Sequence, residues 1–214
     1  MTLAIARPAL DGLWLADALR AGIYRLNRHA EHINRINVFP VADGDTGTNM
    51  SMTLGSVLVA LDRERLEHAG AILVRVADAA LDGARGNSGA ILAQFFHGLG
   101  DSAGHLPQLT TLEFASAVSS GAAYARDAVT RPREGTLLTV LSEFARETMR
   151  LTAAGSATDF RSLFATAMLR MRTSLAGTRE QLEELRSAGV VDAGAMGLIE
   201  LLEGMTDYLE TGEL

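Results

Sequence analysis

The sequence predicts an all-α protein of about eight helices joined by short loops, arranged as an antiparallel up-and-down bundle or barrel. Apolar residues recur every three or four positions along most of the 214 residues, which is the period of an amphipathic helix. No segment shows the apolar–polar alternation of a half-buried strand, and aromatic residues make up only 5% of the chain. Short connections favour antiparallel packing of neighbouring helices.

The first helix is predicted over residues 15–33 by one continuous apolar stripe. Its members are Leu15, Leu19, Ile23, Leu26, Ala30 and Ile33. The same spacing predicts helices over residues 54–61, 73–81, 114–121, 137–148, 163–171 and 198–209. A further helix is expected at 90–96, directly after a glycine-rich turn. Thr110 with Glu113, and Thr178 with Gln181, have the spacing of a capping box, which predicts helix starts there.

The composition excludes several classes of chemistry. The chain has no cysteine, so it can form neither disulfides nor thiolate metal sites, and all 19 basic residues are arginine. Without lysine, Schiff-base chemistry and a P-loop are excluded. The net charge of −7 argues against a general surface for nucleic acids or anionic membranes.

We expect a single domain over residues 1–214, located in the cytoplasm. Arg7, Asp11 and Asp17 interrupt the N-terminal segment where a signal peptide would need an apolar run. No apolar run approaches the roughly 20 residues of a membrane span.

The loop at 37–50 carries two carboxylates, Asp43 and Asp45, separated by one glycine. Both can face one hard cation if the backbone bends between them, and Gly44 and Gly47 would supply that bend. An EF-hand is excluded because Leu54 stands where that loop needs an acidic ligand. The alternative is an ordinary helix entry with an N-cap at residue 48 or 49. The residues alone leave both interpretations open.

A second loop, at 83–89, is rich in glycine and precedes a helix. Such a turn presents free backbone N–H groups and the positive end of the helix dipole, which suits phosphate. It lacks the spacing of a dinucleotide-binding fingerprint. The alternative is a tight turn between helices, capped by Asn87 or Ser88.

Two further segments open helices, at 132–136 and 189–197. Thr136 and Asp192 stand where N-caps are expected, and taken alone both segments are structural. His29 and His32 lie three positions apart on the first helix, which is more typical of a solvated face than of a metal pair.

Together these segments resemble the kinase domain of bacterial fatty acid kinase, a DAK2-type domain similar to the L subunit of dihydroxyacetone kinase. Four motifs carry the resemblance: Asn-Val-Phe-Pro-Val-Ala-Asp-Gly-Asp-Thr-Gly-Thr-Asn-Met at 37–50, Gly-Ala-Arg-Gly-Asn-Ser-Gly at 83–89, Arg-Glu-Gly-Thr-Leu-Leu-Thr-Val at 133–140, and Gly-Val-Val-Asp-Ala-Gly at 189–194. The match runs from about residue 10 to about residue 210. It implies an eight-helix barrel whose loops at one end hold ATP or ADP and magnesium.

The resemblance also assigns roles to single residues. It implies that Asp43, Asp45 and Asn37 bind the metal, which we expect to be two Mg²⁺ ions, and that Asp43, Asp45 and Arg85 act in catalysis. The residues that it assigns to the nucleotide are Thr46, Gly47, Thr48, Asn49, Asn87, Ser88, Gly89, Thr136, Asp192, Ala193 and Gly194.

The function that the resemblance implies is phosphoryl transfer from ATP to a fatty acid carboxylate, held by a separate DegV-like fatty-acid-binding protein. Thr46 replaces the histidine that typically follows Asp-Gly-Asp in dihydroxyacetone kinases, which favours the fatty acid branch. The alternatives are an L-type subunit that acts with a dihydroxyacetone-binding K-type subunit, and a non-catalytic ADP-binding regulatory module. A homodimer is compatible with each. Two departures from the fatty acid kinases are the shorter chain and Ala195, which replaces a common glycine.

Overall fold

Helices make up nearly all of the regular structure in the computed structural model, which describes residues 7–63 and 65–214. The α-helices within these residues are α1 (Gly12–Arg35), α2 (Thr46–Arg63), α3 (Ala69–Gly83), α4 (Gly86–Ala103), α5 (Thr111–Asp127), α6 (Leu137–Ala153), α7 (Phe160–Gln181), α8 (Glu183–Ala188) and α9 (Ala193–Thr211). Each of the eight predicted helices lies inside one of them, and the six-residue α8 is an addition. Residues 1–6 and 64 of the predicted domain lie outside the described residues.

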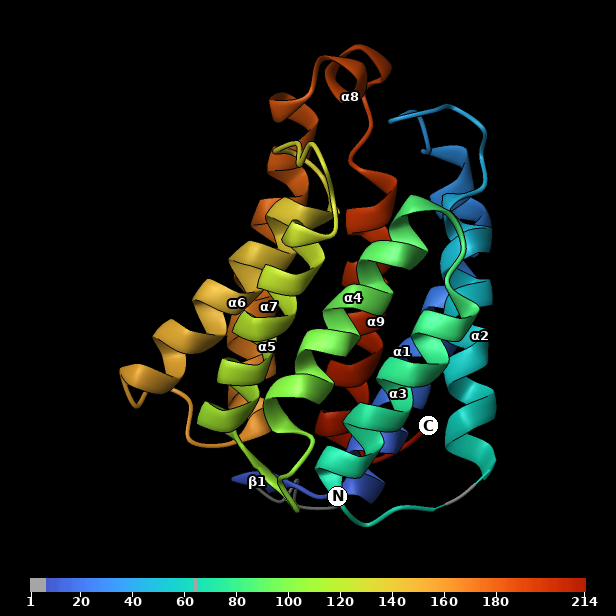
Figure 1. The fold of residues 1–214 in the computed structure, drawn as a ribbon. Coiled ribbons are helices and arrows are strands. Elements are labelled where there is room, and N and C mark those ends of the chain that lie inside the picture. Colours follow the sequence, from blue (N-terminus) through green and yellow to red (C-terminus); the bar gives the residue numbers. More distant parts are fainter. Residues whose placement is uncertain (1–6, 64) are drawn as a thin grey trace.

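The long helices form a closed ring, as predicted. Each packs against the next along the chain, and α9 packs against both α7 and α1. Figure 1 shows the helices running side by side in alternating directions, with α8 at one end in the connection between α7 and α9. No helix in the described part of the chain combines the length and the apolar character that crossing a membrane requires.

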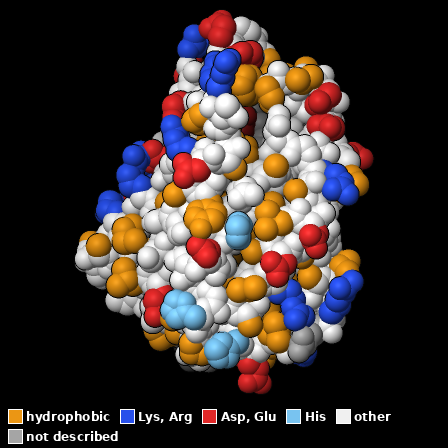
Figure 2. All heavy atoms as spheres, in the orientation of Figure 1, with side chains coloured by type: hydrophobic (Ala, Val, Ile, Leu, Met, Phe, Trp, Pro, Cys, Tyr) orange, Lys and Arg blue, Asp and Glu red, His pale blue; other side chains and the backbone are white. Residues whose placement is uncertain are grey.

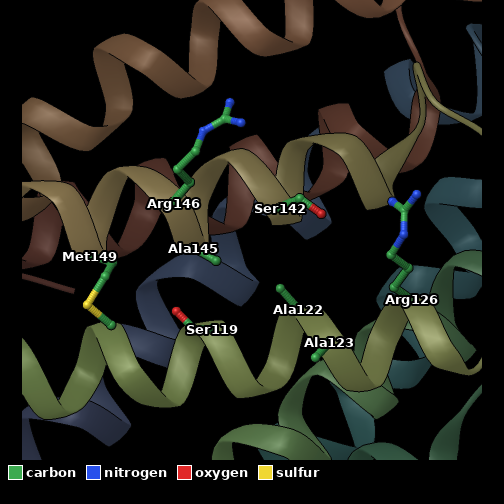
Figure 3. A pocket seen from close by; sticks show the side chains of 8 residues that line it. All are labelled: Ser119, Ala122, Ala123, Arg126, Ser142, Ala145, Arg146 and Met149. Carbon is green, nitrogen blue, oxygen red and sulfur yellow. The ribbon is translucent and has the colours of Figure 1, made fainter.

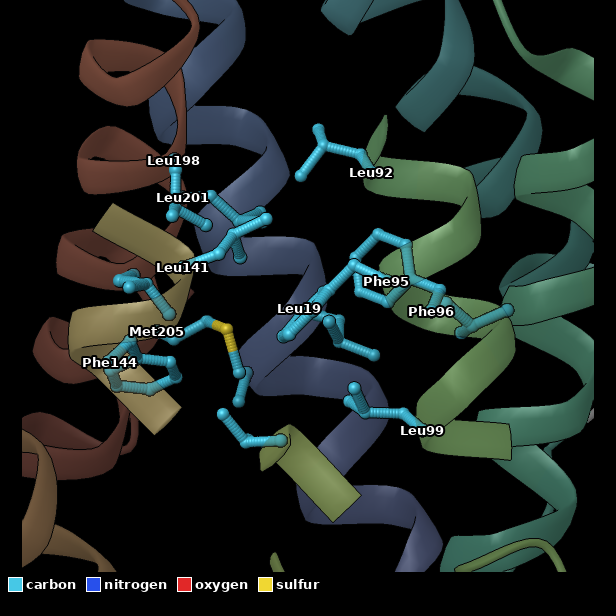
Figure 4. Close-up of a cluster of buried hydrophobic side chains, with 14 of the residues drawn as sticks. Leu19, Leu92, Phe95, Phe96, Leu99, Leu141, Phe144, Leu198, Leu201 and Met205 are labelled. Carbon is cyan, nitrogen blue, oxygen red and sulfur yellow. The ribbon is translucent and has the colours of Figure 1, made fainter. Parts of the chain in front are cut away.

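Side chains from the apolar stripes fill the interior of the ring. Figure 4 shows residues of α1, α4, α6 and α9 pointing into a shared core, including Leu19, Phe95, Phe144 and Leu201, none more than 4% exposed. Burial on this scale is the main stabilising term for a helical domain. The stripes read from the sequence are therefore the core-facing sides of the helices.

The sequence analysis did not predict a short pair of antiparallel strands. Strand β1 (Ala9–Leu10) pairs with β2 (Leu109–Thr110), so the start of the chain is tied to the connection between α4 and α5. Two residues are too few to display an alternating pattern. The capping box predicted beside β2 is confirmed, because Glu113 N donates to Thr110 Oγ1 and the Glu113 carboxylate accepts from Thr110 N.

The other predicted capping box is wrong. Thr178 is buried within the last turn of α7 and its hydroxyl donates to Leu175 O, while Gln181 ends that helix. Thr178 Oγ1 also accepts a hydrogen bond from Asp192 N at 3.0 Å. The residue therefore ties the end of α7 to the start of α9.

The connections that the sequence analysis singled out all lie at one end of the ring. In an up-and-down arrangement every second connection shares an end, which brings together residues 36–45, 84–85, 128–136 and 182–192. Figure 1 shows these connections at the top, opposite the end where N and C are marked. We call this the loop end.

Candidate functional site

Two adjoining cavities open at the loop end. The larger has a volume of about 1020 Å³ and the smaller of about 150 Å³. Phe39, Pro40, Asn87 and Ser88 line both of them, so the two are parts of one site. The volume of the larger cavity is at the upper limit of the range for small-molecule pockets.

The larger cavity is lined by apolar residues along part of its wall, and by polar residues at the starts of α4 and α9 and in the connection between α5 and α6. Its apolar residues come from the end of α3, from α4, from the connection after α5 and from the start of α6: Leu81, Ala84, Ala90, Ile91, Ala93, Ala128, Val129, Leu137 and Leu138. Asn87, Ser88, Asp192 and Gly194 lie where the helices α4 and α9 begin. A ligand with an apolar body and an anionic end would match this division.

Asp43 and Asp45 line the smaller cavity, as the metal prediction requires. Gly44 between them has φ +67°, the left-handed bend that the sequence analysis expected there. Neither carboxylate pairs with another described residue, so both are available to an outside cation. The described residues contain no cluster of three or more His, Cys, Asp or Glu side chains suited to a metal. A pair of carboxylates fits Mg²⁺, which commonly takes one or two and completes its shell with water and phosphate oxygens.

Asn37 organises this loop. Its side chain is buried and its Oδ1 accepts hydrogen bonds from Asp45 N at 3.2 Å and Thr46 N at 3.3 Å. Its Nδ2 donates to Phe39 O and Val41 O. Both lone pairs of the amide oxygen are thus engaged by the start of α2, and the assignment of Asn37 as a metal ligand stays a prediction.

Helix α2 begins at Thr46, so the alternative prediction of an N-cap at residue 48 or 49 is wrong. Thr46 and Asn49, which the resemblance assigned to the nucleotide, line the smaller cavity. Thr48 is exposed and pairs with Asn34 instead, through Asn34 Nδ2 to Thr48 Oγ1 at 2.9 Å. Gly47 does not supply a bend, because it is helical and buried.

The glycine-rich turn places Asn87 and Ser88 on both cavities, as the phosphate prediction requires. The N-cap of α4 is Arg85, without a side-chain cap, so the prediction that Asn87 or Ser88 caps the helix is wrong. An N-terminus without a side-chain cap keeps its N–H groups for a ligand. Gly89 faces away from the cavity: a Cβ there would lie 2.3 Å from Thr53 Oγ1.

Arg85 is exposed and lines neither cavity, and its guanidinium donates to Ala84 O. Two other arginines, Arg131 and Arg133, line the larger cavity from the connection between α5 and α6. The Arg133 guanidinium lies 5.6 Å from the Phe39 ring centroid, so the two flanking loops meet across the site. The sequence analysis placed Arg133 in one of the four motifs but assigned neither arginine to the site, since a charged loop carries no pattern that tells which way it folds.

Asp192 joins three helices. It is the N-cap of α9, and its Oδ2 accepts from Ala195 N at 2.8 Å and from Leu137 N, at the start of α6, at 3.0 Å. Its own N–H donates to Thr178 at the end of α7. Thr136 is the N-cap of α6, as predicted, although its hydroxyl accepts no hydrogen bond from the helix and instead donates to Arg133 O.

Of the remaining predicted nucleotide residues, Gly194 lines the larger cavity and Ala193 is buried beside it. The loop end thus brings together most of the residues that the resemblance assigned.

A separate hollow of about 350 Å³ lies between α5 and α6 on the outside of the ring. Figure 3 shows small side chains of the two helices facing each other there, with Arg146 pointing outward. It is lined by Ser119, Ala122, Ala123, Arg126, Ser142, Ala145, Arg146 and Met149. It shares no residue with the site at the loop end.

Comparison with known proteins identifies the family. Residues 40–207 match the DAK2 domain. The chain belongs to the DAK2 domain family. Protein YloV of Bacillus subtilis is 38% identical over 201 residues, and an uncharacterized protein of Staphylococcus aureus (strain USA300) is 32% identical over the same length. Each match covers 94% of this chain but only 36% of the relative, so this DAK2 domain spans about a third of their length.

Solved structures show the same fold. The dihydroxyacetone kinase from C. freundii in complex with AMP-PNP and Mg²⁺ matches with a TM-score of 0.70 at 16% identity, over 97% of this chain and 36% of that one. The native form of that kinase matches with a TM-score of 0.61 at 18% identity. The predicted likeness of the DAK2 domain to dihydroxyacetone kinase is confirmed at the level of the fold.

The stability of this DAK2 domain should depend on the ionisation of Asp192. Burial raises the pKa of Asp192 to about 6, against the opposing effect of three backbone N–H donors. A carboxyl whose pKa is higher in the folded chain favours folding at low pH, and this contribution is lost as the pH rises through about 6. Between pH 5 and pH 8 the wild type should therefore lose about 1 kcal/mol more than Asp192→Asn, measured by urea unfolding. Parallel pH profiles for the two proteins would contradict this assignment.

Proposed function

We propose that this DAK2 domain binds Mg·ATP at the loop end and transfers the γ-phosphoryl group to a fatty acid carboxylate presented by a DegV-like carrier protein, which yields an acyl phosphate. The observation that carries the proposal is the pair of carboxylates, Asp43 and Asp45, which pair with no other described residue. They line a cavity that adjoins the start of α4, which has no side-chain cap, and a larger cavity with an apolar wall. The complex of a kinase of this fold with AMP-PNP and Mg²⁺ supports the proposal.

In this proposal each part of the site has a separate task. Asn87 and Ser88, with the first N–H groups of α4, bind the phosphates, and the apolar wall holds the base. Asp43 and Asp45 hold the magnesium, which when bound neutralises charge on the phosphate oxygens. Asn37 keeps the loop that carries both carboxylates in place. The resemblance implies two magnesium ions, and a metal titration with nucleotide present would count them.

The lining of the two cavities agrees with an acceptor that is already ionised. No histidine lines either cavity, and the chain has no lysine or cysteine. On the face drawn in Figure 2, histidines lie in the middle and lower parts, away from the loop end. A fatty acid carboxylate is ionised near pH 7 and needs alignment with the γ-phosphate more than a general base.

Dihydroxyacetone is the second candidate acceptor, favoured by the fold match to a dihydroxyacetone kinase. In that case the domain is an L-type subunit and a K-type protein holds the ketose. The acceptor there is a hydroxyl, which needs a base to take its proton. The partner would have to supply that base, because no histidine lines the cavities and their aspartates are assigned here to the metal and to helix starts.

A phosphotransfer assay with labelled ATP and Mg²⁺ tests the proposal. We expect acyl phosphate only when both the domain and a fatty-acid-loaded DegV-like carrier are present. Phosphoryl transfer to dihydroxyacetone in the presence of a K-type subunit, with none to the fatty acid, would identify dihydroxyacetone as the acceptor. Full activity on free fatty acid without a carrier would refute the proposal that a separate protein presents the acceptor. Nucleotide binding without transfer to any acceptor would favour a regulatory module.

The two arginines of the connection between α5 and α6 offer a comparison with Arg85. If positive charge at the cavity stabilises the phosphates, Arg133→Ala should lower the affinity for Mg·ATP roughly fivefold to tenfold, because it removes a charge that faces the ligand. Arg85→Ala should change it less than twofold, since Arg85 lines neither cavity. Isothermal calorimetry on both variants measures the difference, and a larger loss in Arg85→Ala would restore Arg85 to the site.

A further inference from the structure

Gln94 is a polar side chain in the apolar part of the larger cavity. It lies on α4, is half-buried, and lines the cavity beside Ala90, Ile91 and Ala93. Among the described residues, none forms a hydrogen bond with its amide. A partly buried amide without a partner loses hydrogen bonds that it would make in water.

The other polar side chains of this cavity lie at helix starts or in the connection between α5 and α6, which contributes Thr130, Arg131 and Arg133. The Thr136 hydroxyl donates to Arg133 O, and the Asp192 carboxylate accepts from the starts of α6 and α9. Asn87 and Ser88 stand at the start of α4, where the cavity meets the smaller one. Among the described lining residues, Gln94 therefore differs by its position: it is a polar side chain between apolar residues of α4, with its hydrogen-bonding capacity left for a ligand.

The position of Gln94 along α4 relates it to the phosphate end of the site. Asn87, Ile91 and Gln94 are spaced four and three residues apart, so they share one face of the helix. Seven residues at 1.5 Å each place Gln94 about 10 Å along the axis from Asn87. One face of α4 thus offers an anion site at its start, apolar side chains next, and an amide beyond them.

We propose that Gln94 recognises the base of the bound nucleotide, and that this base is adenine. The proposal rests on the proposed function, because it requires the phosphates to lie at Asn87 and Ser88. A primary amide presents an acceptor beside a donor, and adenine presents the complementary N6 amine beside N7, a pairing that glutamine makes with two hydrogen bonds. The apolar side chains around Gln94 would cover the faces of the ring.

Calorimetry with three ligands in the presence of Mg²⁺ tests this assignment: ATP, purine riboside triphosphate, which lacks the 6-amine, and inorganic triphosphate. In Gln94→Leu we expect ATP to bind about tenfold more weakly or worse. The affinities for the other two ligands should stay within about twofold of the wild type. Gln94→Met, which keeps the length of the side chain without the amide, should behave in the same way.

Gln108→Leu is the matched control, because Gln108 is exposed in the connection at the opposite end of the ring. It should leave all three affinities unchanged. Unchanged ATP affinity in Gln94→Leu and Gln94→Met, or an equal loss for all three ligands, would overturn the role of Gln94. A wild type that binds inorganic triphosphate as tightly as ATP would also overturn it but would leave the phosphate site intact. A wild type that binds none of the three would overturn the proposed function itself.

Discussion

Asp45→Asn should reduce Mg-dependent turnover by roughly a hundredfold, and Asp43→Asn should do the same, because each removes one of the two carboxylates that face the smaller cavity. Steady-state phosphotransfer with the carrier present measures the loss. Circular dichroism should be unchanged, since neither side chain pairs with another described residue. Asp78→Asn, at an exposed position on α3, is the control that changes charge away from the site.

The affinity for ATP, measured with and without Mg²⁺, distinguishes metal binding by the two aspartates from other roles. Without Mg²⁺, the two carboxylates repel the triphosphate, so the double variant Asp43→Asn/Asp45→Asn should bind metal-free ATP more tightly than the wild type does. With Mg²⁺ the order should reverse. Unchanged Mg·ATP affinity in the double variant would remove both residues from the metal site.

Gly47→Ala should destabilise the fold by about 3 kcal/mol, at the upper end of the cost of overpacking. A Cβ on Gly47 would lie 2.1 Å from Ala30 O, a backbone atom of α1 that cannot move without moving the helix. The free energy of unfolding in urea, followed by circular dichroism, measures the change.

Gly55 provides the matched control on the same helix. A Cβ at Gly55 meets nothing within 4 Å, so Gly55→Ala should stabilise the domain by up to about 1 kcal/mol through helix propensity alone. Equal effects of the two substitutions would contradict the close approach of α1 and α2 at Gly47.

The sequence was sufficient to predict seven of the eight long helices from their apolar period of three to four, which burial of one side of a helix leaves in the chain. The eighth, α4, was predicted from the glycine-rich turn that precedes it. The sequence was not sufficient for α8, which is six residues long and buries only Leu185. Thr178 shows a related limit. Its spacing to Gln181 matches a capping box, but α7 continues through both residues and the hydroxyl instead serves the start of α9.

The candidate site was predictable where chemistry and local backbone coincide, as at Asp43, Asp45 and Ser88. It was less predictable where a residue type serves packing: Gly47 and Gly89 have the composition of a phosphate loop, yet each lets two helices approach. Gln94 belongs to none of the motifs, and Arg133 opens one of them without a role assigned to it. Their place in the cavity depends on how the helices and connections assemble, which a single sequence does not display.

A crystal structure of this chain with Mg²⁺ and a non-hydrolysable ATP analogue tests the central claim most directly. Our account predicts the triphosphate at the start of α4 in contact with Asn87 and Ser88, metal between the phosphates and the carboxylates of Asp43 and Asp45, and the adenine against Gln94. A nucleotide bound elsewhere, such as in the hollow between α5 and α6, or a metal that touches neither aspartate, would contradict the account.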